Sequence, residues 1–286
     1  MTERVILRVL LAPAPRSGAW RKALAAACSD AGWDYKEWWG GALPALKPDH
    51  NALIIGWSYD QSIPEAHWCV LACDPQSGAA CLKQHRDLPE GELLYHVAGR
   101  FGIMSKLAKE GAPVWRDDSE VIEVPFLGKV RAAGEPYTPP TAQGPLAIYE
   151  TIPPLAGSTA EWPGRHFNYP DSTTTNAGGV KLELTGRRRL LLNGPNFSLP
   201  PGLWTARARF DLDPQWTAVD LLMEWGHGVS VQSLRQVLTA SGRYELTMTH
   251  RWEIAAPGDF RISIMMPVLD GTLTFHGVTV ECEHDH

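Results

Sequence analysis

The stretch that decides the fold is residues 244–254, Tyr-Glu-Leu-Thr-Met-Thr-His-Arg-Trp-Glu-Ile, in which large, mostly apolar side chains alternate with Glu, Thr and Arg. Residues 204–210, Trp-Thr-Ala-Arg-Ala-Arg-Phe, repeat this period of two, and residues 260–266 continue it. Such alternation is typical of strands with one buried face. Several strands separated by Gly, Pro and Asp turns predict an all-β sandwich, jelly-roll-like, with Trp204 and Trp252 in its core.

The N-terminal part has a different pattern, in which short apolar runs alternate with segments of helical spacing. The runs end in turn residues, as buried strands do, and the helical segments carry apolar residues on one face. This order predicts an α/β domain, Rossmann-like but degenerate. The expected strands are residues 4–11, 51–57 and 68–72, and the expected helices are residues 17–31, with Ser17 as cap, and a segment from the capping box at 87–90 to Gly111 that buries Leu93, Val97, Phe101, Met104 and Leu107.

The two patterns are separated by a segment rich in Pro and Gly between Ala132 and Pro145. Such a composition cannot hold a helix and predicts a semi-rigid connector. The predicted organisation is an α/β domain over residues 1–134, a linker over 135–146, and a β-sandwich over 147–286.

Composition excludes several partners. The chain has 286 residues and a formal net charge of −6, so it has no global basic field that would attract nucleic acid. The first apolar run, Val5 to Leu11, is interrupted by Arg8, too short for a membrane span and without a cleavage site. Five cysteines without CxxC spacing indicate no disulfides. We expect synthesis in the cytoplasm without a signal peptide.

The sequence also lacks the motifs of common cofactor sites and active sites. The turn after the first strand contains Pro13 and Pro15, which remove the backbone donors that NAD or ATP would need. No GxSxG, HExxH or GxxxxGK[ST] is present. We therefore expect no cofactor, no metal and no catalysis.

Three acidic or histidine-containing segments are candidates for metal binding or acid–base catalysis, but each also fits a structural interpretation. Asp211-Leu212-Asp213 could hold a metal but fits a strand-end turn, and His284-Asp285-His286 could do so but fits a frayed end. Asp117, Asp118 and Glu120 could act as acid and base, although a solvated turn is favoured.

Two segments are candidates for glycan binding, because a sugar needs an aromatic face beside planar polar groups. The segment 161–171 supplies Trp162, Arg165, His166 and Tyr169, and the turn 225–228 supplies Trp225 and His227. The alternatives are a loop folded back onto the sandwich and an ordinary tight turn.

Four arginines lie on the polar phase of the predicted strands: Arg207, Arg209, Arg251 and Arg261. They could form a basic patch for an acidic polysaccharide. Carboxylates such as Glu245 share that phase, so a ladder of salt bridges is favoured.

The C-terminal half resembles a small sandwich module of bacterial polysaccharide-related proteins. The resemblance is carried by residues 192–206, Leu-Asn-Gly-Pro-Asn-Phe-Ser-Leu-Pro-Pro-Gly-Leu-Trp-Thr-Ala, and by residues 241–246, 259–262 and 277–280. In such modules an aromatic residue usually follows Gly-Pro directly, whereas here Asn196 precedes Phe197. The resemblance covers the chain from about Ala147 and implies a carbohydrate-binding-like fold, as in modules fused to glycosyltransferases or in phage-like particles such as gene transfer agent head spikes.

These observations predict a non-enzymatic glycan-binding protein whose sandwich binds surface or capsular polysaccharide. The N-terminal domain would attach to a protein assembly, for example as part of a spike in a released particle. A homo-oligomer would supply avidity. Two alternatives stay open. One is a glycosyltransferase-related enzyme with a sugar nucleotide near Gly40-Gly41, Gly56-Trp57 and Asp117, and the other is a purely structural assembly protein.

Overall fold

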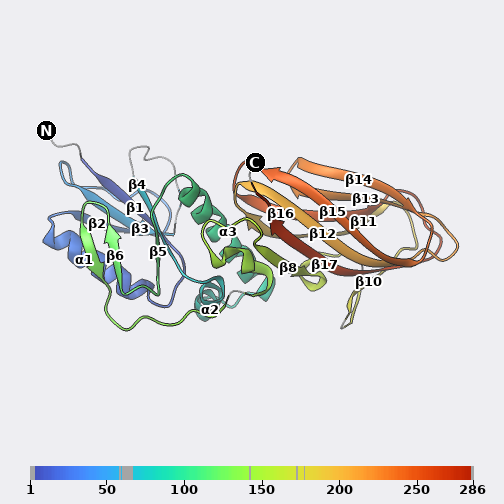
Figure 1. Ribbon diagram of the computed structural model, residues 1–286, viewed down its shortest axis with the longest axis horizontal. Helices are drawn as coiled ribbons and strands as arrows, with labels where there is room; N and C mark the ends of the chain where they lie inside the picture. Colours follow the sequence, from blue (N-terminus) through green and yellow to red (C-terminus); the bar gives the residue numbers. More distant parts are fainter. Residues whose placement is uncertain are drawn as a thin grey trace. The chain divides into compact units, whose positions relative to one another are not determined.

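The computed structural model describes residues 4–57, 59, 67–141, 143–171, 173–176 and 178–284 (Figure 1). The chain forms two compact units, each made of two segments. The first unit contains Met1–Leu88 and Ile103–Ala142, and the second contains Pro89–Gly102 and Gln143–His286. The second unit thus includes a segment that lies well before the expected linker.

The first unit is built on a five-stranded parallel sheet with the strand order β2-β3-β1-β4-β5. Two helices, α1 (Ser17–Asp30) and α2 (Pro75–His85), and the hairpin β6–β7 complete it. The sequence indicated β1, β3, β4 and α1 but missed β2 and α2. The strands are β1 (Ile6–Leu11), β2 (Asp34–Trp38), β3 (Ala52–Gly56), β4 (His67–Ala72), β5 (Val114–Arg116), β6 (Val121–Val124) and β7 (Gly128–Arg131).

One face of this sheet packs on α1, whose buried residues Trp20, Leu24 and Cys28 recur at helical spacing. Ser17 does not cap this helix, because the N-cap position is Arg16 and no side-chain capping bond forms. On β1, the buried Arg8 guanidinium lies 4.3 Å from the ring centre of Trp68 and 4.8 Å from that of Trp38, so two aromatic faces solvate its charge.

Helix α3 (Glu90–Lys109) follows the predicted pattern, with Leu93, Val97, Phe101, Met104 and Leu107 buried. Its first turns, as far as Gly102, belong to the second unit, where Phe101 packs on Tyr149 with ring centres 5.5 Å apart. No helix in the described residues is long and apolar enough to span a membrane.

The second unit is a sandwich of two antiparallel sheets, as predicted. One has the order β15-β12-β17-β10-β9, with β8 also paired to β17, and the other has the order β11-β16-β13-β14. Two short 3-10 helices, η1 (Gly144–Glu150) and η2 (Gly164–His166), flank β8. The strands are β8 (Thr159–Pro163), β9 (Thr174–Asn176), β10 (Gly179–Glu183), β11 (Arg189–Leu199), β12 (Gly202–Asp213), β13 (Val219–His227), β14 (Ser230–Leu238), β15 (Gly242–Trp252), β16 (Ala256–Ile264) and β17 (Thr272–Cys282).

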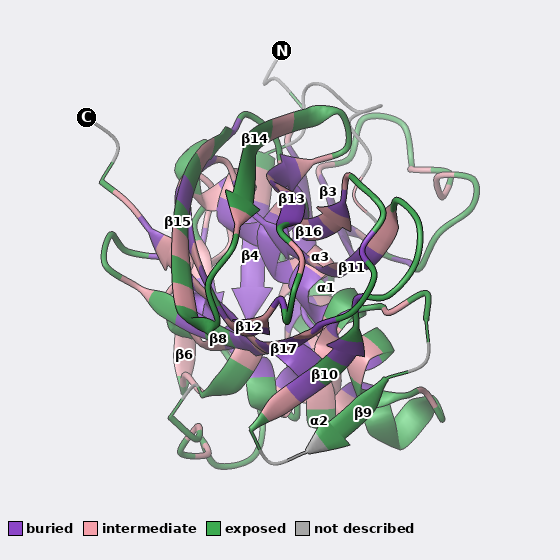
Figure 2. Cartoon of the chain, turned by 90° about the vertical axis from the view of Figure 1, so that its right-hand side faces the viewer, coloured by how far each residue is buried: buried purple, intermediate pink, exposed green. Residues whose placement is uncertain are grey.

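The core of the sandwich is aromatic. Trp204 and Trp252 are buried, as the alternation predicted, and Phe210, Phe260 and Phe275 lie with them among the largest enclosed side chains. Strands β13 and β16 are mainly buried, whereas the edge strand β14 is mostly exposed (Figure 2). The sandwich therefore has one central core, and β14 is an exposed edge of it.

Candidate functional site

Trp162 is a core residue and is not available to a sugar. It lies on β8, where Thr159 and Glu161 point outward while Ala160 and Trp162 point inward. Its ring is fully buried, 5.7 Å from Phe197, and its Nε1 donates a hydrogen bond to the Pro145 carbonyl at 3.1 Å. Stacking on a ligand would require the sandwich to open, so the prediction of Trp162 as a glycan contact is wrong.

Trp225 is buried in the same way. Its ring centre lies 5.8 Å from that of Trp162 and 4.9 Å from that of Trp252, and its Nε1 donates to the Trp204 carbonyl at 3.2 Å. The Trp225 ring is fully buried, so no part of it is exposed to a ligand. The prediction of a glycan contact at Trp225 is also wrong.

Tyr169 and His227 are half-buried and have other neighbours. The Tyr169 hydroxyl donates to the Gly164 carbonyl at 2.7 Å and thereby fixes the segment between β8 and β9; burial raises the pKa of this phenol. His227 contacts His250 and Trp252, with ring centres 6.0 Å and 5.4 Å away. Neither residue lines the groove described next, so a role in glycan binding stays a prediction for both.

Arg165 and His166 do line a groove of about 760 Å³ in the second unit. The short helix η2 presents them, because Phe167 is anchored in the core beside Phe275 with ring centres 4.9 Å apart. Two predicted site residues are thus brought together. The other lining residues are Glu90, Gly91, Glu92, Tyr95, Phe167, Asn168, Pro195, Asn196 and Pro257.

The strand β11 is irregular where it borders this groove. Its register with β16 shifts between Pro195 and Phe197, so Asn196 is an extra residue with a φ of 66°. A bulge of this kind turns a side chain out of the ladder. Asn168 is held beside it, because its backbone exchanges hydrogen bonds with Asn193 at 2.8 Å and 3.1 Å. Two amide side chains are therefore presented on firm backbone.

Helix α3 contributes residues that the sequence did not single out. Glu90 and Glu92 stand in its first turn, and Tyr95 follows one turn later with 44% of its surface exposed. The Tyr95 ring packs edge-on against His96, 5.6 Å away, which leaves an aromatic surface toward solvent. The groove therefore has an exposed ring close to carboxylate, amide and guanidinium groups.

His166 is the titratable group most affected by this setting. Burial, with the Arg165 charge, lowers the pKa of its imidazole, although Glu90 acts in the opposite direction. The ring is therefore neutral at pH 7, with one donor and one acceptor nitrogen. Within the described part of the chain, its Nε2 is buried without a hydrogen-bond partner. The imidazole therefore borders the groove as an uncharged ring.

The arginines of the predicted strands form ion pairs. Arg207 pairs with Glu281 at 2.6 Å, Arg209 with Glu161 at 2.8 Å, and Arg261 with Asp259 at 2.5 Å, while Arg251 also has an interaction partner. Ion pairs are thus confirmed for the first three, but Glu245 takes part in none of them, and the pair of Arg261 with Asp259 lies within one strand, β16, instead of across a ladder. These charges are engaged and do not form a free patch for an acidic polymer.

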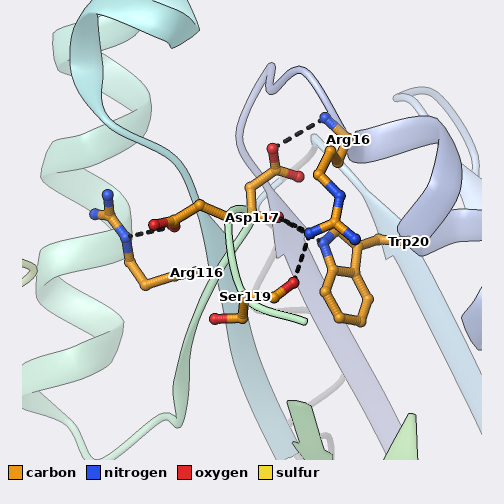
Figure 3. A network of polar contacts seen from close by, with 6 residues as sticks. Arg16, Trp20, Arg116, Asp117 and Ser119 are labelled. Carbon is orange, nitrogen blue, oxygen red and sulfur yellow. Dashed lines mark hydrogen bonds and ion pairs between the residues drawn. The ribbon is translucent and has the colours of Figure 1, made fainter. Parts of the chain in front are cut away.

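Each carboxylate of residues 117–120 has its own partner, and Figure 3 shows the contacts between Asp117 and Arg16. Asp117 is buried and accepts a hydrogen bond from the Arg16 backbone N–H at 2.9 Å, Asp118 pairs with Arg116 at 3.3 Å, and Glu120 pairs with Arg131. The Arg16 guanidinium donates to the carbonyls of Asp117 and Ser119. These hydrogen bonds connect the start of α1 to the turn after β5.

Burial raises the pKa of the Asp117 carboxyl from 3.8 to about 6. Below about pH 3 the group is protonated in the folded and unfolded chains. As the pH rises it ionises first in the unfolded chain, and above pH 6 the folded state carries the full cost of a buried charge. We expect the free energy of unfolding to fall by about 2 kcal/mol between pH 4 and pH 7 through this group alone. Urea titrations at both pH values should show a smaller fall in Asp117→Asn, whereas Asp118→Asn should behave like the wild type. If the free energy of unfolding fell as much in Asp117→Asn as in the wild type, the raised pKa of Asp117 would be contradicted.

The other two acidic segments were the candidates for a metal site. Asp211 pairs with Arg243 at 3.0 Å and with His276 at 2.9 Å, so it belongs to a strand-face network. Asp285 and His286 lie outside the described residues. Across the described residues no three His, Cys, Asp or Glu side chains are grouped to hold an ion.

Comparison with known proteins finds no matching protein family and no matching curated relative. Solved structures with a similar arrangement include a CBM4 module (12% identity, TM-score 0.31, covering 44% of this chain and 94% of that one). They also include the CBM22-1 xylan-binding domain from Paenibacillus barcinonensis Xyn10C (11%, TM-score 0.27, 46% and 98%). A third is the C-terminal CBM6 module of a marine laminarinase from Zobellia galactanivorans (10%, TM-score 0.31, 43% and 99%). These neighbours are carbohydrate-binding β-sandwiches, with identities and TM-scores too low to transfer a ligand.

Proposed function

We propose that the protein binds glycan without transforming it, through the groove lined by Tyr95, Arg165, His166, Asn168 and Asn196. The observation that supports this most directly is the exposed Tyr95 ring beside planar polar side chains on a firm backbone. An aromatic face suits the apolar face of a pyranose, and amide, guanidinium and carboxylate groups suit its hydroxyls. A volume of about 760 Å³ is enough for a few sugar units.

The charge of the groove favours a neutral polysaccharide. Glu90 and Glu92 face one cation, Arg165, while the neighbouring His166 is neutral at pH 7. An acidic sugar would meet more negative than positive charge. The setting we propose is attachment to a surface or capsular polysaccharide, as a spike of a phage-like particle, with the first unit as the anchor in an oligomer. The resemblance carried by residues 192–206 supports that setting.

The test is a glycan array on the full chain, followed by calorimetry on the sugars that bind. We expect Tyr95→Ala to weaken binding about tenfold, or about 1.4 kcal/mol, because the stacking surface is lost. Asn168→Ala should also weaken it, through lost hydrogen bonds to hydroxyls.

The matched control is Trp216→Ala. This ring is 92% exposed but lies outside the groove. If Trp216→Ala abolished binding and Tyr95→Ala did not, the groove would be the wrong site. If no glycan bound the full chain, glycan binding itself would be wrong.

A further inference from the structure

The first unit contains a separate pocket of about 840 Å³ at the carboxyl ends of its parallel strands. Leu11 is the last residue of β1, while Trp39 and Trp57 directly follow β2 and β3. The starts of both α1 and α2 contribute hydroxyl groups, from Ser17 and Ser77.

The topology favours this place for a ligand. From β1 the chain first builds one side of the sheet, with β3 and β2, and then the other side, with β4 and β5. The strand order therefore reverses beside β1. In open parallel sheets the crevice at such a point, outside the carboxyl ends of the strands, is where ligands bind.

Two tryptophans form an exposed aromatic wall in this pocket. Trp39 and Trp57 are 42% and 36% exposed, and their ring centres lie 5.1 Å apart at an angle of 68°. The Arg21 guanidinium lies 5.3 Å from the Trp39 ring centre. Edge-to-face contact holds both indoles in place while leaving indole surface uncovered, which suits a flat ring of a ligand.

The cationic groups of the pocket are the guanidinium groups of Arg21 and Arg86, His85 also lines it, and no Asp or Glu is among the lining residues. Arg21 shares its charge with Glu37 at 2.9 Å. Within the described residues the Arg86 side chain is exposed and forms no ion pair. Arg86 is thus a guanidinium available to an anion at one end of the pocket.

We propose that this pocket binds a nucleotide, with its base against Trp39 and Trp57 and its phosphate against Arg86 and Arg21. The turn after β1 cannot cradle the phosphate, because Pro13 and Pro15 have no N–H. The guanidinium groups of Arg21 and Arg86 bind the phosphate instead. This site lies in a different unit from the glycan groove and does not depend on it.

Calorimetry on the full chain with AMP and UDP tests this assignment. Adenosine, uridine and inorganic phosphate are titrated separately as reference ligands that contain only the nucleoside or only the phosphate. We expect at least one nucleotide to bind at least tenfold more tightly than its nucleoside and than phosphate. Arg86→Ala should weaken that binding at least tenfold, and Trp57→Ala should do the same and reduce the ligand-induced change in tryptophan fluorescence.

The matched control is Lys83→Ala, which removes an exposed cation of α2 that does not line the pocket. It should leave affinity unchanged, and thermal unfolding should show that all variants are folded. Absence of nucleotide binding at millimolar concentration would overturn the proposal, as would an unchanged affinity in both Arg86→Ala and Trp57→Ala. Equal binding of glucuronate would assign the pocket to an acidic sugar and overturn it too.

Discussion

Replacing Trp162 by alanine is expected to lower the free energy of unfolding of the sandwich by about 3–5 kcal/mol. The ring is fully buried and contacts Phe197 and Trp225. A β-carbon at the neighbouring Gly258 would lie only 2.9 Å from the Trp162 ring, so the space around it is filled. Truncation leaves a cavity that this packed core cannot close, and the Pro145 carbonyl loses its hydrogen-bond donor.

Chemical denaturation followed by circular dichroism measures this loss. Trp216→Ala is the control, because that indole is 92% exposed and its removal should change stability by no more than about 0.5 kcal/mol. A Trp162→Ala protein as stable as the wild type, with glycan binding selectively lost, would mean that the indole is a ligand contact after all. We expect any loss of binding to follow unfolding instead.

Replacing Arg16 by alanine should cost about 3 kcal/mol in the first unit. The guanidinium is enclosed, and it donates to the carbonyls of Asp117 at 3.1 Å, Ser119 at 2.5 Å and Gly134 at 3.1 Å. Alanine would leave the Ser119 and Gly134 carbonyls without this donor, while the Asp117 carbonyl keeps the Trp20 indole N–H at 3.0 Å, and each buried acceptor left unsatisfied costs about 1–3 kcal/mol.

Urea unfolding of Arg16→Ala checks this value, with Lys22→Ala, an exposed cation of the same helix, as control. Arg16→Lys should recover only part of the stability, because an ammonium cannot reproduce the planar fork that reaches several carbonyls. Full recovery by lysine would show that charge alone, rather than the geometry of the guanidinium, provides the stabilisation.

The sandwich could be predicted from the sequence because its signal is local. Residues 204–210 and 244–252 alternate strictly; in the first segment the residues in phase with Trp204 are buried, and in the second those in phase with Trp252 are buried or half-buried while the others are exposed. Strand β2 was missed because Asp34–Trp38 has little apolar character, and α2 was missed although Asp74 and Pro75 form a good helix start, with the Asp74 carboxylate accepting from Ser77 N–H at 2.7 Å.

The glycan groove was only half predictable. Arg165 and His166 could be predicted as candidates because aromatic residues flank them in the sequence. Trp162 was wrongly assigned to a loop, although Ala160 and Trp162 alternate with Thr159 and Glu161 as in a strand. Tyr95 carries no local sign of its role. It lies on the polar side of a helix far away in sequence, and only the tertiary fold brings it to Asn196.

The central position of β17 has a consequence for the order of events during synthesis. This strand pairs with β12, β10 and β8, and it is the last of the sandwich strands to leave the ribosome. Until Thr272–Cys282 emerges, β12 and β8 have no common neighbour, although β12 can already pair with β15. We therefore expect the sheet β15-β12-β17-β10-β9 to complete its pairing only after β17 has been synthesised, whereas the sheet β11-β16-β13-β14 needs no contribution from that strand.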